Sequence, residues 1–118
     1  PLLREHNRLA SIRPLLDKVY QPSGEILVPP DETTVCRCEE VTAGDIRQCV
    51  AEGATGPNQL KAYTRCGMGP CQGRMCGLTV SEVIADARDK PVEEIGYYRL
   101  RPPIKPVTLG ELAAMEDT

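Results

Sequence analysis

The chain of 118 residues contains no tryptophan, no phenylalanine and only one histidine. Without large aromatic side chains, a single small domain of this length has to rely on a modest aliphatic core. Small domains of this kind usually gain further stability from disulfides, a bound metal or a partner surface. Because His6 has no second histidine beside which to bind a metal, we expect it on the surface.

Other absences narrow the classes of function. No apolar run is long enough to span a bilayer, and no signal peptide is visible. Acidic and basic residues are mixed along the chain, with a net charge of −3, which leaves no basic face for nucleic acid. Outside the cysteine-containing stretches there is no pairing of histidine with carboxylates and no phosphate-binding glycine motif. We therefore expect no catalytic residues in this chain.

The start of the chain and its thiols suggest where the protein belongs. The sequence begins with Pro1 rather than methionine, so we expect a piece of a longer protein. Thiols arranged for a metal suggest a reducing compartment. This favours the cytoplasm, with peripheral attachment to a membrane through partner subunits as the alternative.

The six cysteines form two groups and one isolated residue. Cys36 and Cys38 form a tight pair, whereas Cys66, Cys71 and Cys76 share the glycine-rich run 64–77. A thiol pair combined with a thiol-rich glycine loop indicates a metal site, because glycine allows positive φ and lets backbone N–H groups approach sulfur. A disulfide scaffold is the alternative, but the cysteine content lies below the roughly 8–10% typical of such chains. Cys49 has no partner at ligand spacing, and we expect it in the core.

Periodicity and capping signals predict several helices. The predicted segments are a helix in 1–20 that Pro14 either kinks or restarts near Arg13, a helix from Thr42 and Asp45 to about Glu52 that Gly53 ends, one or two turns at Gln59–Thr64, and an amphipathic helix at Leu78–Arg88. The last helix has Val80, Val83, Ile84 and Ala87 on its inner face.

Turn residues and prolines predict the remaining segments. We expect Glu25–Val28 to be extended, because clusters of turn residues flank it. Tyr97–Leu100 is also expected to be extended, Arg101–Pro106 to be polyproline-like, and Thr108 with Glu111 to cap one last turn in Leu109–Met115.

Two motifs carry a family resemblance. Val35-Cys36-Arg37-Cys38-Glu39-Glu40-Val41-Thr42 and the run 64–77 resemble the [2Fe–2S] domains similar to bacterioferritin-associated ferredoxin. The variant most like them lies at the C-terminus of FAD-dependent dehydrogenase subunits, such as those of opine oxidase, hydrogen cyanide synthase and proline or hydroxyproline dehydrogenases. Anaerobic glycerol-3-phosphate dehydrogenase carries a more distant version. The resemblance covers residues 33–113.

The resemblance implies an all-α fold of the helix–turn–helix type, with an N-terminal connector helix and an extended proline-rich C-terminal tail. Residues 1–32 would connect to a larger flavoprotein body, 33–90 would form the [2Fe–2S] domain, and 91–118 would form a C-terminal arm. The implied role is to relay electrons from a flavin. The implied cofactors are a [2Fe–2S] cluster and, in the rest of the parent protein, FAD, and the implied partners are its flavin-binding domain and partner subunits.

The ligand set remains open from spacing alone. Cys66 and Cys71 are as far apart as Cys71 and Cys76, so either pair could join Cys36 and Cys38. In related members the position matching Cys66 is often alanine, and the resemblance therefore favours Cys36, Cys38, Cys71 and Cys76. We also expect the helix beginning at Cys76 to favour a thiolate there.

Three arginines flank the cysteines. Arg37, Arg65 and Arg74 either moderate the charge of the site or are ordinary surface residues.

Two other functions compete with electron transfer. A structural zinc module would use the same thiols for folding alone. A stand-alone ferredoxin that docks on an iron-storage or reductase partner is the other alternative.

Overall fold

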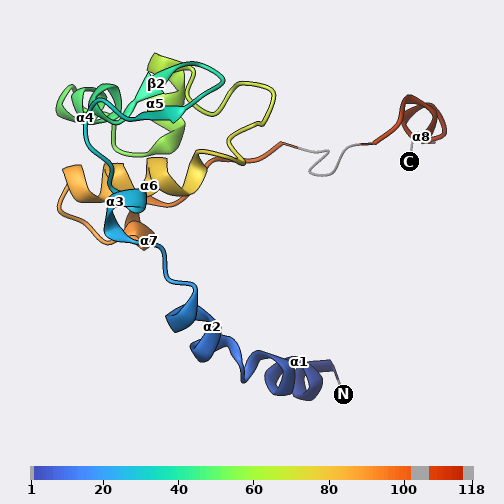
Figure 1. Ribbon diagram of the computed structural model, residues 1–118. Helices are drawn as coiled ribbons and strands as arrows, with labels where there is room; N and C mark the ends of the chain where they lie inside the picture. Colours follow the sequence, from blue (N-terminus) through green and yellow to red (C-terminus); the bar gives the residue numbers. More distant parts are fainter. Residues whose placement is uncertain (1, 102–106, 116–118) are drawn as a thin grey trace.

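The computed structural model describes residues 2–101 and 107–115. Within these residues the chain forms eight helices and one small sheet (Figure 1). The elements are α1 (Leu2–Ala10), α2 (Arg13–Val19), α3 (Gly24–Leu27), β1 (Thr34–Cys36), β2 (Val41–Thr42), α4 (Ala43–Ala51), α5 (Pro57–Thr64), α6 (Gly77–Ala87), α7 (Val92–Ile95) and α8 (Leu109–Ala113). Apart from Arg101, the predicted polyproline segment lies outside the described residues.

The fold is mostly helical, but the all-α prediction is wrong in one respect. Strands β1 and β2 pair antiparallel, with Thr34 opposite Thr42 and Cys36 opposite Val41. Threonine and valine favour extended backbone, and Glu40 closes the connecting turn with a φ of 55°. The hairpin presents the first cysteine pair to the rest of the fold.

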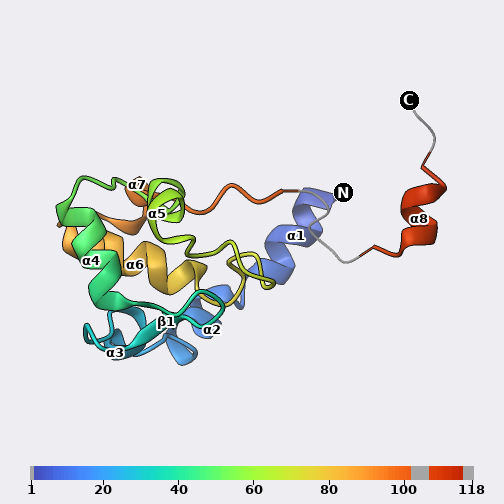
Figure 2. The same ribbon diagram turned by 90° about the horizontal axis from the view of Figure 1, so that it is seen from above.

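Helix α6 is the centre of the core. It packs against α3, α4, α5 and α7, and it lies between these helices in both views (Figures 1 and 2). Fully buried aliphatic side chains fill the space between these elements: Ile46, Leu60, Val80, Val83 and Ile84. The predicted inner face of α6 is therefore confirmed at Val80, Val83 and Ile84.

The C-terminal end of α6 differs from the prediction. Ala87 is exposed, and Ala85 is buried in its place. The chain turns back here, where the Lys90 N–H donates to the Ala85 carbonyl at 3.0 Å. The turn leads into α7, which the sequence analysis did not predict.

The N-terminal helices lie apart from this core. Helix α2 begins at Arg13 with Pro14 in its first turn, which confirms the predicted restart, and His6 is exposed as expected. No residue of α1 or α2 is buried, and both helices extend away from the core in Figures 1 and 2. Together with α8, which also lies apart from the core in both views (Figures 1 and 2), these helices give a radius of gyration of 17.7 Å, above the roughly 13–14 Å of a compact chain of this length.

The segment predicted to be extended at 25–28 is instead helical. Ser23 has extended backbone at the N-cap of α3, and the Val28 N–H donates to the Gly24 carbonyl at 2.8 Å. The flanking turn residues therefore limit this segment to a single helical turn but do not prevent that turn.

None of the helices in the described part of the chain is long and apolar enough to cross a membrane.

Two predicted helix caps are confirmed. Thr42 and Asp45 form a reciprocal capping box at the start of α4, and Gly53 follows that helix with a φ of 109°. Thr108 and Glu111 form the same box at α8. The α4 cap also fixes the end of β2, and hence the position of the cysteine hairpin.

Candidate metal centre

The first two cysteines lie at the turn end of the hairpin formed by β1 and β2. Cys36 closes β1 and is buried, whereas Cys38 lies in the turn and is exposed. The glycine-rich loop comes so close here that a Cβ on Gly69 would overlap the side chain of Cys38. Only glycine allows this approach.

The loop after α5 is a series of tight turns. Arg65 ends α5 in the left-handed conformation, and Gly67 and Gly73 have φ values of 83° and 78°. Within the loop, the Gln72 N–H donates to the Gly69 carbonyl at 2.8 Å. This curvature turns Cys66 inward and ends at Cys76, the N-cap of α6.

Five of the six free thiols converge at this place. The sulfur atoms of Cys36, Cys66 and Cys76 all lie within 4.8 Å of one another, and all three residues are buried. The thiols of Cys38 and Cys71 interact with each other on the exposed side. The structure thus groups two of the four predicted ligands, Cys36 and Cys76, with Cys66, and it pairs the other two, Cys38 and Cys71, with each other.

The sixth cysteine is separate. Cys49 lies on α4 and packs, partly buried, against the hydrophobic core. Burial, followed by the nearby Glu52 and Asp45 carboxylates, raises the pKa of its thiol. A core residue of this kind is what the sequence analysis predicted for Cys49.

The surroundings shift the pKa values of Cys71 and Cys76 in opposite directions. The pKa of the Cys71 thiol is lowered, chiefly by the Met75 backbone N–H. The Cys38 thiol and the N–H groups of Gly73 and Arg74 lower it further. The Cys66 thiol and then burial raise the pKa of Cys76. This direction is opposite to the one predicted from the position of Cys76 at the start of α6, because a neighbouring thiol and burial both act against the thiolate.

Tyr98 is part of this site, and the sequence analysis missed it. Its ring lies against the loop glycines, so that a Cβ on Gly67 or Gly73 would come within 2.6 Å and 2.9 Å of ring carbons. Only 6% of the residue is exposed, and its hydroxyl has no hydrogen-bond partner. Burial, and next the Cys66 thiol, raise its pKa. The available signal was a tyrosine pair in a chain almost without aromatics.

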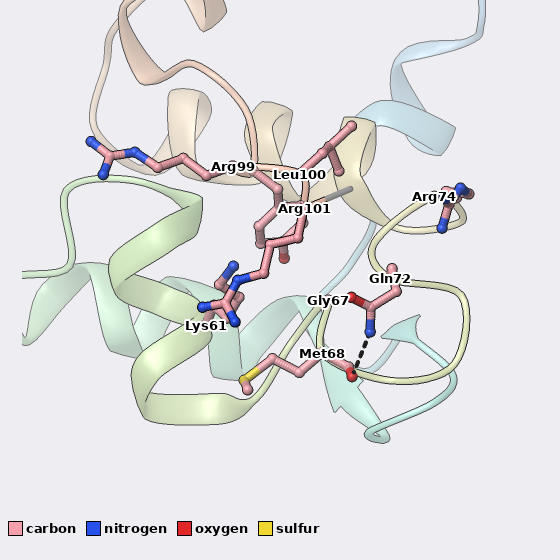
Figure 3. Close-up of a pocket in the computed structure, with 9 residues that line it drawn as sticks. Lys61, Gly67, Met68, Gln72, Arg74, Arg99, Leu100 and Arg101 are labelled. Carbon is pink, nitrogen blue, oxygen red and sulfur yellow. Dashed lines mark hydrogen bonds between the residues drawn. The ribbon is translucent and has the colours of Figure 1, made fainter. Parts of the chain in front are cut away.

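A cationic pocket borders the outer side of the loop (Figure 3). It has a volume of about 500 Å³, and Tyr98 is part of its wall. Its charged lining residues are all basic: Lys61, Arg74, Arg99 and Arg101. The Lys61 ammonium lies 5.7 Å from the centre of the Tyr98 ring, within the range of a cation–π interaction.

The three arginines that flank the cysteines have different surroundings. Arg65 pairs with Glu39 at 3.1 Å, and Arg74 donates to the Cys71 carbonyl at 3.3 Å. Arg37 is exposed. Arg65 therefore links the glycine loop to the hairpin, and Arg74 brings a positive charge beside a cysteine.

The donor set fits a thiophilic metal or an iron–sulfur group. Thiolate sulfur is the ligand of zinc and of iron–sulfur clusters, whereas oxygen ligands select magnesium and calcium. Crowded thiols with raised pKa values release protons readily only when a cation binds. The backbone N–H groups around Cys71 and the unpartnered Tyr98 hydroxyl both suit anionic sulfur.

Comparison with known proteins identifies the family. Residues 31–116 match the model of the sarcosine oxidase A3 domain, and the chain belongs to this family. It is 54% identical over 105 residues to an opine oxidase subunit of Rhizobium meliloti (strain 1021), covering 89% of this chain and 23% of that protein. It is 50% identical over 108 residues to the corresponding opine oxidase subunit of Agrobacterium tumefaciens (strain Ach5), covering 90% of this chain and 22% of that protein.

A more distant relative belongs to another oxidoreductase system. The chain is 42% identical over 76 residues to hydrogen cyanide synthase subunit HcnB of Pseudomonas aeruginosa, covering 64% of this chain and 16% of that protein. No solved structure matches the chain. The chain spans less than a quarter of the length of the opine oxidase subunits that it matches.

Proposed function

We propose that this chain binds a [2Fe–2S] cluster and is the electron-transfer domain of an FAD-dependent oxidoreductase of the opine or amino-acid dehydrogenase type. The observation that carries the proposal is the convergence of five thiols from a β-hairpin and a glycine loop. Membership of a family shared with opine oxidase subunits supports the choice of oxidoreductase.

The proposed ligands are Cys36, Cys38, Cys71 and Cys76. The Cys38 and Cys71 thiols interact directly with each other, and the Cys76 sulfur lies within 4.8 Å of the Cys36 sulfur. Cys66 belongs to the same buried group of sulfur atoms as Cys36 and Cys76. Cys66 and Cys76 both lie within this distance of Cys36, so the choice of Cys76 as the fourth ligand rests on the family resemblance.

The chain's own residues would bind the cluster and shield part of it from water. A [2Fe–2S] cluster, when bound, takes up and releases a single electron. The backbone N–H groups at Gly73, Arg74 and Met75 would stabilise negative charge at Cys71, and Arg74 beside the Cys71 carbonyl would add positive charge. Because Cys38 is exposed and Cys36 and Cys76 are buried, electrons would enter or leave on the Cys38–Cys71 side.

The domain division follows the same proposal. Residues 1–32 would connect to a flavin-binding body, 33–90 would form a domain of the bacterioferritin-associated ferredoxin type, and 91–118 would be a C-terminal arm. The exposed apolar side chains of α1 and α2, among them Leu2, Leu9 and Leu16, support a connector that packs against other parts of the parent protein. FAD and partner subunits would belong to that larger assembly.

The experiment is anaerobic purification followed by analysis for iron, acid-labile sulfide and zinc. We expect iron and sulfide in equal amounts, visible absorption that dithionite bleaches, and an electron paramagnetic resonance signal in the reduced state. A colourless protein that holds one zinc ion after iron–sulfur reconstitution would overturn the proposal in favour of a structural zinc module. Cys49→Ala is the matched control, because it removes a thiol outside the group and should leave the metal content unchanged.

A further inference from the structure

Tyr98 buries a polar group that the proposed ligand set does not explain. Among the side chains that the structure describes, its hydroxyl is the one buried polar group without a hydrogen-bond partner. Burying a hydroxyl costs free energy unless a hydrogen bond compensates. A partner for this hydroxyl is therefore expected in the working protein.

The position of the hydroxyl is fixed from several sides. A Cβ on Gly67 would lie 2.9 Å from the hydroxyl oxygen, so the loop backbone closes against it. Asn58 holds the chain on both sides of Tyr98: its Nδ2 donates to the Tyr97 carbonyl at 3.1 Å, and its Oδ1 accepts from the Arg99 N–H at 3.0 Å. The ring therefore cannot easily turn its hydroxyl toward water.

Sulfur is what surrounds this hydroxyl. Tyr98 belongs to the same buried cluster as Cys36, Cys66 and Cys76, and after burial the thiols of these three cysteines act on its hydroxyl, Cys66 first. The Lys61 ammonium lies 5.7 Å from the ring centre.

We propose that Tyr98 donates its hydroxyl hydrogen to a sulfur of the metal centre, on the side where Cys66 meets Cys76, and thereby raises the reduction potential. This inference rests on the proposed function, because it requires a [2Fe–2S] cluster at the thiols. A hydrogen bond to sulfur stabilises the more negative, reduced state more than the oxidised state. Tyr98 is thus a positioning residue, and it does not bind the metal itself.

The test compares Tyr98→Phe with the wild type by potentiometric titration of the cluster's paramagnetic resonance signal. For this test the whole protein, as the cell produces it, is purified anaerobically. Phenylalanine keeps the ring that packs against Gly67 and Gly73 and removes only the hydroxyl. We expect the cluster to be retained and its midpoint potential to become more negative.

Tyr97→Phe is the matched control. It removes a hydroxyl from the adjacent residue, and that hydroxyl donates to the Gly73 carbonyl at 3.3 Å instead of facing sulfur. Its potential should stay close to that of the wild type. An unchanged potential in Tyr98→Phe, or equal shifts in both variants, would overturn the inference while leaving the cluster in place. A wild type without any cluster would instead overturn the proposed function.

A second measurement applies if Tyr98→Phe fails to hold the cluster. Incorporation of 3,5-difluorotyrosine at position 98 keeps the hydroxyl and makes it more acidic, and therefore a stronger donor. We expect the midpoint potential to become more positive than that of the wild type. A potential that does not move in this substituted protein would contradict the hydrogen bond to sulfur.

Discussion

The ring of Tyr98 lies against the backbone of Gly67, so close that a Cβ on this glycine would come within 2.6 Å of ring atom Cζ. Gly67 also has a φ of 83°, a conformation that side chains other than glycine rarely adopt. Two independent restrictions therefore meet at one residue of the cysteine loop. The C-terminal segment and the loop are built as one unit around this contact.

The first prediction concerns this glycine. Gly67→Ala should lower the free energy of unfolding by more than the about 1–3 kcal/mol expected from backbone strain alone, because its methyl group also displaces Tyr98. Gly53→Ala is the matched control, since Gly53 has a φ of 109° with nothing within 4 Å of an added Cβ. Urea unfolding of both variants gives the comparison. Equal losses would show that contact with Tyr98 adds nothing.

The second prediction concerns the ligand set. Cys36→Ala, Cys38→Ala, Cys71→Ala and Cys76→Ala should each bleach or destabilise the visible spectrum, because each removes one thiolate of the proposed ligand set. Cys66→Ala should leave the spectrum almost intact. Iron content and absorption after anaerobic purification provide the measurement. Loss of the cluster in Cys66→Ala with retention in Cys76→Ala would move the ligand pair to Cys66 and Cys71.

The helices that the sequence predicted are those with local signals. The capping box of Thr42 and Asp45 involves residues three apart, and the apolar spacing of α6 repeats within one segment, so both can be read without knowledge of the fold. The hairpin was missed because its two strands contain only five residues. A non-glycine residue, Glu40, also takes the positive φ in its turn.

The same distinction applies to the site, where features set by residues close in sequence could be predicted and contacts between distant residues could not. Cysteine spacing predicted which stretches meet, since both groups lie in recognisable loops. Spacing could not exclude Cys66, because the two gaps in the loop are equal. Tyr98 reaches the loop through contacts with Gly67 and Gly73, more than twenty residues earlier in the chain, and no periodic pattern marks such a contact.

The third prediction tests the cap of α4. Thr42→Ala removes the hydroxyl that accepts from the Asp45 N–H at 3.1 Å, and it should lower the free energy of unfolding by about 0.5–2 kcal/mol. Thr108→Ala breaks the same type of box in α8, a helix without buried residues. We expect this control to leave global urea unfolding unchanged. Similar losses in both variants would show that α4 contributes no more to the core than α8.

The fourth prediction concerns the pH dependence of this cap. The Thr42 N–H and then its hydroxyl hold the pKa of the Asp45 carboxyl below its usual value of 3.8. Because the folded pKa is the lower one, the cap's contribution is complete above the ordinary pKa and is lost as pH falls through the folded value. Nuclear magnetic resonance of the Thr42 amide during an acid titration measures this directly. A midpoint at or above 3.8 would contradict the cap's charge-assisted character.

The fifth prediction concerns Asn58, which joins α5 to the C-terminal segment. Its side chain donates to the Tyr97 carbonyl and accepts from the Arg99 N–H, so it fixes the backbone immediately before and after Tyr98. Asn58→Ala removes both bonds and should lower the free energy of unfolding by about 1–3 kcal/mol, at roughly 0.5–1.5 kcal/mol for each hydrogen bond. The same change should loosen the attachment of Tyr98 to the cysteine loop.

Hydrogen exchange measures this loosening at a defined atom. In Asn58→Ala the Arg99 amide should exchange faster, because its acceptor is gone, while the Gly77 amide, which donates to the Gly73 carbonyl at 2.8 Å, should keep its rate. Asn58→Asp is the matched control: it retains an acceptor for Arg99 but loses the donor to Tyr97, so its Arg99 amide should remain protected. Unchanged exchange at Arg99 in Asn58→Ala would mean that Gly67 and Gly73 alone hold Tyr98 in place.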